Sequence, residues 1–134
     1  MFEQVKTILT EQYNAEMKKF DELKSQIDAM EEVFKNDTSE ADYQSTVKGL
    51  NAKYGLFKRG KEYKKELRDA QIEYDKKLKQ YDKDYKKYLE LKNEAAKINI
   101  YIIQKKLEQL MNANSLEDIK MTEAEAEKII NEGV

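Results

Sequence analysis

Carboxylates are the most numerous side chains in this sequence that could do chemistry. The chain holds 27 Asp and Glu residues. The densest groups are Glu31 with Glu32, Glu117 with Asp118, and Glu123 with Glu125 and Glu127. A di-iron helix bundle needs Glu-x-x-His motifs, and the sequence has no histidine. An EF-hand loop needs oxygen ligands around a central glycine, a layout that residues 36–40 lack. We therefore interpret these acids as solvated surface and predict no metal site.

Nucleophilic catalysis is also unsupported by the residue types. The sequence contains neither Cys nor His, so it lacks a thiolate and the usual general base. Ser and Thr hydroxyls have only Lys as a candidate base, and no Ser lies in a strained, glycine-flanked turn. We predict a protein that is not an enzyme, with no catalytic residues and no cofactor.

A glycine-rich basic stretch, residues 53–60, is the strongest candidate for a contact site. Three of the four glycines, Gly49, Gly55 and Gly60, lie within twelve residues, which predicts a kink, a turn or a tight helix crossing. A phosphate-binding P-loop is not expected, because its Gly-Lys must be followed by Ser or Thr and here Glu62 follows. Apolar residues stand here among basic ones. We predict that partner binding uses Leu56, Phe57, Lys58, Arg59 and Lys61.

A second candidate patch lies near the C-terminus. It consists of Ile119, Met121, Ile129 and Ile130. These side chains can fold back on the preceding helix or dock on a partner, and the sequence does not choose between the two.

One long helix, residues 61–111, is expected to position these sites, because this stretch has no Gly or Pro and its apolar residues recur every three or four positions. Two heptad seams follow each other with a one-residue shift in phase. The first is Leu67, Gln71, Tyr74, Leu78, Tyr81, Tyr85 and Tyr88, and the second is Leu89, Asn93, Ala96, Ile100, Ile103, Leu107 and Leu110. The tyrosine-rich seam is interpreted as a core stripe, with a stacking platform for nucleic-acid bases as the alternative.

The remaining helices follow from the same periodicity. We expect helices over residues 2–35, 38–52 and 123–132, a turn over residues 53–60, and a single domain over residues 1–134. Asp37 with Glu40, and Thr122 with Glu125, resemble capping boxes at two helix starts. The predicted fold is all-α. It is an elongated helical hairpin or three-helix bundle with coiled-coil character around the long helix, plus a short C-terminal helix.

Charge is distributed unevenly along the chain. Residues 1–42 carry a net charge of −6, residues 43–93 a net of +7, and residues 94–134 a net of −3. The acidic first helix can lie against the basic middle helix, within one chain or between two. Alternatively, the basic, tyrosine-rich middle segment can bind nucleic acid.

These patterns predict a helical adaptor, assembly factor or inhibitor that binds a protein of unknown identity. A homo-oligomer, most simply a dimer, is expected to cover Ile100, Ile103, Leu107 and Leu110. No apolar run approaches the ~20 residues of a membrane span, and we expect a cytoplasmic protein. Abundant Lys, Asn and Tyr suggest a bacterial or phage origin.

Overall fold

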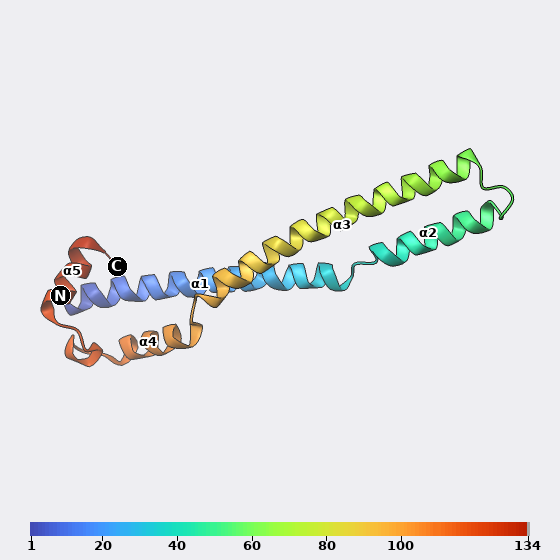
Figure 1. Cartoon of the computed structure of the whole chain (residues 1–134). Coiled ribbons are helices and arrows are strands. Elements are labelled where there is room, and N and C mark those ends of the chain that lie inside the picture. Colours follow the sequence, from blue (N-terminus) through green and yellow to red (C-terminus); the bar gives the residue numbers. More distant parts are fainter. Residues whose placement is uncertain (134) are drawn as a thin grey trace. The chain divides into compact units, whose positions relative to one another are not determined.

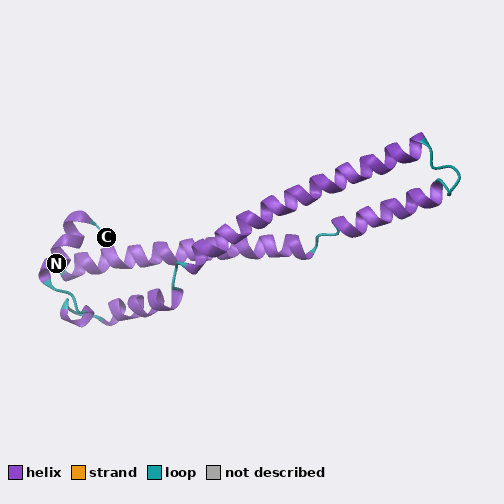
Figure 2. Ribbon diagram, viewed as in Figure 1, coloured by secondary structure: helices purple, strands orange, loops and turns teal. Residues whose placement is uncertain are grey.

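The computed structural model describes residues 1–133, so only the last residue of the predicted domain lies outside the described residues. The helices are α1 (Phe2–Lys35), α2 (Ser39–Lys53), α3 (Lys61–Ala96), α4 (Ile100–Asn112) and α5 (Glu123–Glu132), with a short 3₁₀ helix η1 (Glu117–Ile119) (Figure 1). The described residues form no strand (Figure 2). The all-α fold with long helices in a hairpin-like arrangement is confirmed, while the three-helix bundle and the coiled-coil packing stay predictions.

The chain divides into two compact units, which are described separately. We name them the terminal unit, residues 1–26 with the described residues from Leu91 onward, and the hairpin unit, Ile27–Glu90. Helices α1 and α3 each contribute to both units. The single domain expected from the sequence stays a prediction.

The terminal unit has a small aliphatic core. Val5 and Ala126 are fully buried, and Leu9 and Leu110 are nearly so. Half-buried side chains surround them: Tyr13, Leu116, Ile119, Met121, Ile129 and Ile130. The heptad seam expected in the first helix, which is Phe2, Leu9, Tyr13, Glu16, Phe20, Leu23, Ile27, Met30 and Phe34, includes Leu9. It does not include Val5, the most deeply buried large side chain of the described residues.

The prediction of one helix over residues 61–111 is wrong, because the helix breaks at residues 97–99. The Asn99 side chain caps α4 by accepting a hydrogen bond from the backbone N–H of Ile102 at 3.2 Å. The N–H groups of Lys97 and Ile98 donate to carbonyls three residues back, which tightens and ends α3. An asparagine cap therefore separates the two helices without glycine or proline.

Aromatic rings hold the hairpin unit together. The Phe34 ring of α1 lies 5.0 Å from that of Tyr81 and 5.4 Å from that of Tyr88 in α3. Tyr43 of α2 stacks on Tyr74 of α3 with ring centroids 4.7 Å apart. These contacts agree with the core-stripe interpretation of the tyrosines, because the rings pack on one another.

Candidate partner-binding surfaces

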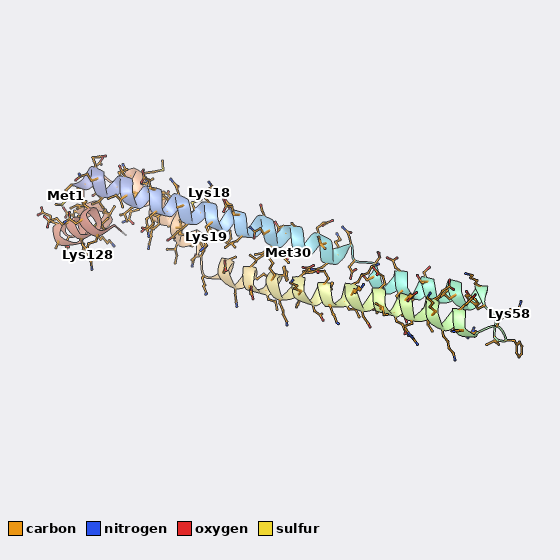
Figure 3. The ribbon with its side chains drawn as sticks, turned by 90° about the horizontal axis from the view of Figure 1, so that it is seen from above. Met1, Lys18, Lys19, Met30, Lys58 and Lys128 are labelled. Carbon is orange, nitrogen blue, oxygen red and sulfur yellow. The ribbon has the colours of Figure 1, made fainter. Side chains whose placement is uncertain are left out.

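The predicted contact residues lie at the end of the hairpin formed by α2 and α3. We name Leu56–Arg59 the hairpin tip. The N–H of Lys58 donates to the carbonyl of Gly55 at 3.1 Å, which closes a turn. Phe57 is 102% exposed and Leu56 77% exposed, so neither apolar side chain packs against the unit. Figure 3 labels Lys58 at this end of the hairpin, with the neighbouring side chains directed into open space.

Polar and aromatic contacts join α2 to α3 directly behind the tip. The Tyr63 hydroxyl donates to the side chain of Asn51 at 2.6 Å, and the Tyr63 ring packs against that of Tyr54. The guanidinium of Arg59 lies over the Tyr63 ring, 5.2 Å from its centroid. These contacts join the end of α2 to the start of α3, and the hairpin tip is the loop between these two ends.

An ion pair also spans the two helices behind the tip. Lys53 Nζ lies 3.4 Å from Glu66 Oε1. A hydrogen bond from the Tyr54 hydroxyl lowers the pKa of the Glu66 carboxyl, and the Lys53 charge adds to this effect. The negative charge of Glu66 raises the pKa of Lys53 in turn. Both groups are therefore charged at neutral pH.

The surroundings of the tip are strongly basic. Residues 53–68 contain seven Lys and Arg side chains and two Glu side chains, a net charge of +5. Lys58 and Lys61 are exposed beside the two apolar side chains. The structure thus brings together Leu56, Phe57, Lys58, Arg59 and Lys61 at one end of the hairpin unit.

The second predicted patch lies elsewhere, in the terminal unit. Ile119, Met121, Ile129 and Ile130 are half-buried against the core cluster that contains Leu110. Of the two arrangements left open by the sequence, these side chains adopt the one in which the C-terminal segment folds back on its own chain. Their role in partner binding stays a prediction.

The structure removes the argument from which a dimer was predicted. We expected a second chain to cover the apolar residues of 100–110, yet Ile103 and Leu110 are 6% and 3% exposed within the chain. A dimer therefore stays a prediction.

An open hollow lies in the hairpin unit, where α1 ends, α2 begins and α3 passes, and no sequence pattern predicted it. Its volume is about 810 Å³. It is lined by Ala29, Glu32, Val33, Phe34, Asn36, Asp37, Thr38, Ser39, Asp42, Lys77, Gln80, Tyr81 and Asp84. A heptad pattern cannot predict this hollow, because the lining residues come from three helices and the turn between two of them.

The hollow is negatively charged. Four carboxylates line it and one lysine accompanies them. Each carboxylate accepts a hydrogen bond from a neutral neighbour, such as Gln80 to Asp84 at 2.9 Å and Asn36 to Glu32 at 3.2 Å. Among the described residues none of the four has an ion-pair partner. Hydrogen bonds from Ser39 lower the pKa of Asp37, so its carboxyl remains ionised.

The predicted capping box at this turn does not form as expected. Thr38 is the N-cap of α2 but makes no side-chain capping bond. Asp37 instead accepts hydrogen bonds from the backbone and the hydroxyl of Ser39. By contrast, Thr122 caps α5 by accepting from the N–H of Glu125 at 3.2 Å.

The described residues show no grouping typical of a metal site and no membrane-spanning helix. Within residues 1–133, no three His, Cys, Asp or Glu side chains are grouped so that they could hold a metal ion. No helix in the described part of the chain has the length and apolar character needed to cross a bilayer.

Comparison with known proteins found no match. No protein-family model matches the sequence, and neither a curated protein nor a solved structure is significantly similar to it.

Proposed function

We propose that this protein is a non-enzymatic recognition protein, an adaptor, assembly factor or inhibitor, that binds another protein through its helical surfaces. The observation that carries the proposal is the pair of solvated apolar side chains at the hairpin tip, Leu56 and Phe57. A cytoplasmic location and a bacterial or phage origin stay predictions from the sequence.

The energetics favour a partner at this position. Burial of a Leu or Phe side chain is worth about 1.5–3 kcal/mol, and the hairpin unit gains little of this from either residue. Binding sites commonly concentrate their energy in a few buried anchors, and an apolar centre with a polar rim is typical of interfaces. The basic residues beside the tip favour an acidic partner surface and accelerate encounter with it.

A pull-down from lysate of the source cell, with and without nuclease, tests this function. The bait is the full chain, and the test variant carries Leu56→Ser and Phe57→Ser. Because both side chains are solvated, the variant is expected to fold normally and to lose its protein partners. The matched control is Met111→Ser, which changes a 78% exposed side chain of α4 and should retain them. Capture of the same proteins by the tip variant would refute the proposal.

Nucleic-acid binding is the second candidate, supported by the basic middle segment with its net charge of +7. The cations that would contact phosphates are Lys58, Arg59, Lys61, Lys64 and Lys65. Replacing them with Gln should weaken binding to DNA or RNA and flatten its salt dependence. Unchanged salt dependence in this variant would exclude the idea.

A further inference from the structure

We propose that the hairpin tip recognises a second copy of this chain by inserting Leu56 and Phe57 into the acidic hollow at the α1–α2 turn. The inference rests on the proposed function, because it uses the same tip as the recognition element. It adds the identity of one partner and the surface that receives the tip.

Charge complementarity is the first argument. The tip region has a net charge of +5, and the hollow presents four carboxylates with one lysine. The carboxylates accept hydrogen bonds from neutral groups and form no ion pair among the described residues, although the charge of Lys77 acts on Asp37. Docking would place Lys58 and Arg59 of one chain beside the carboxylates in the hollow of the other. Ion pairs of this kind fix the orientation of the two chains and increase their rate of encounter.

Apolar complementarity is the second argument. The hollow has an apolar part formed by Ala29, Val33, Phe34 and Tyr81. Val33 is 63% exposed, which leaves an uncovered apolar surface beside the carboxylates. The volume of about 810 Å³ exceeds the space that a Leu and a Phe side chain need. Each surface therefore has an apolar centre beside charges of opposite sign.

The geometry of the hairpin unit allows both contacts to form at once. The hollow and the tip lie at opposite ends of α2, and α2 itself has no buried residue. The stretch of α3 from Lys61 to Tyr81 spans about 30 Å. Two antiparallel hairpins can therefore place each tip at the other's hollow. This arrangement has two-fold symmetry and closes as a dimer.

The test is sedimentation velocity of the full chain over about 1 μM to 1 mM, a range that detects weak and moderate self-association. The tip variant carries Lys58→Glu and Arg59→Glu, and the hollow variant carries Glu32→Lys and Asp84→Lys. All four residues lie in the hairpin unit, and circular dichroism of each variant checks that helix content is retained. We expect the native chain to dimerise, and each variant to do so at least about tenfold more weakly.

Mixing the two variants gives the decisive result. In the mixed dimer, Leu56–Arg59 of one chain, whose net charge changes from +2 to −2, faces the hollow of the other, whose net charge changes from −3 to +1, and the second contact is native. Each variant alone has two repulsive contacts. We therefore expect the mixture to form a heterodimer with affinity near that of the native dimer.

The outcomes separate this inference from the proposed function. A native monomer throughout the range, dimers insensitive to the substitutions, or a mixture that stays monomeric would each overturn the inference. In those cases tip-dependent capture of another protein from lysate would leave the proposed function standing. Tip-dependent sedimentation of a monomeric chain with vesicles of anionic lipid, or with nucleic acid, would overturn the inference and identify a different occupant.

Discussion

The terminal unit and the hairpin unit are both helical, but they are stabilised by different side chains. The terminal unit buries Val5, Leu9, Leu110 and Ala126 in an aliphatic cluster. The hairpin unit relies on ring contacts between Phe34 and the tyrosines of α3, and Tyr88 is its most buried ring at 9% exposed. Helix α2, which supports the tip, has no buried residue at all.

The two units therefore gain their stability in different ways. An aliphatic cluster gains stability from removing apolar surface from water. Tyrosine pairs join two helices without requiring a closed core, because each hydroxyl can remain at the solvated edge. A hairpin of helices built in this way leaves the side chains at its tip exposed.

The largest effect should come from the aliphatic cluster. Leu110→Ala removes a side chain that is 3% exposed and should lower the free energy of unfolding by roughly 3 kcal/mol. Urea denaturation followed by circular dichroism measures the loss. The neighbouring Met111→Ala, at a 78% exposed position, is the control and should change stability by less than about 0.5 kcal/mol. Equal effects would refute the assigned core.

The aromatic cluster should show an intermediate effect confined to its own unit. Phe34→Ala removes three ring contacts and should cost about 2 kcal/mol, less than for a fully buried Phe. Hydrogen exchange should speed up within Ile27–Glu90 and change little in α4 and α5. The control is Phe57→Ala, whose fully exposed ring supports no packing. Uniform loss of protection in both units would show that they unfold together.

Single hydrogen bonds should contribute less. The Tyr88 hydroxyl donates to Glu31 at 2.6 Å, and Tyr88→Phe should cost about 1.5 kcal/mol in thermal unfolding because the acceptor is charged. Tyr85→Phe, at a 43% exposed position, should have almost no effect. Similar losses from both substitutions would contradict the role given to the bond.

The cap between α3 and α4 should have an effect of similar size. Asn99→Ala removes the acceptor for the N–H of Ile102 and should destabilise α4 by about 1 kcal/mol. Exchange of the first amides of α4 should accelerate, and Asn99→Asp should restore their protection. No change in those amides would mean that another group ends the helix.

The smallest effect should come from the ion pair behind the tip. The folded-state pKa of Glu66 is lowered, so its stabilising contribution is present above the unfolded-state pKa and is lost as pH falls through the folded value. Glu66→Gln should therefore be slightly less stable than the native chain at neutral pH and equally stable in acid. A difference that grows in acid would contradict the sign of the shift.

Helical periodicity predicted more of the fold than of the candidate site. It located α1 and placed Tyr88 on a buried seam, because burial along a helix repeats every three or four residues. It missed the end of α3, since Asn99 acts through one side-chain hydrogen bond that leaves no gap in the apolar pattern. The glycines and charges of residues 53–60 were enough to identify the tip. Periodicity could not identify the hollow, which exists only because the α1–α2 turn lies beside α3.

Disulfide cross-linking tests the contact between tip and hollow most directly, because the chain contains no cysteine of its own. One chain carries Leu56→Cys at the tip, which preserves Phe57, and the other carries Ala29→Cys in the hollow. The control pairs the Leu56→Cys chain with Tyr101→Cys, a change at a 62% exposed position on α4. We predict that mild oxidation of the mixture gives mainly the heterodimer in which the two introduced thiols are joined, as identified by mass spectrometry. Cross-linking no greater than in the control would contradict the account.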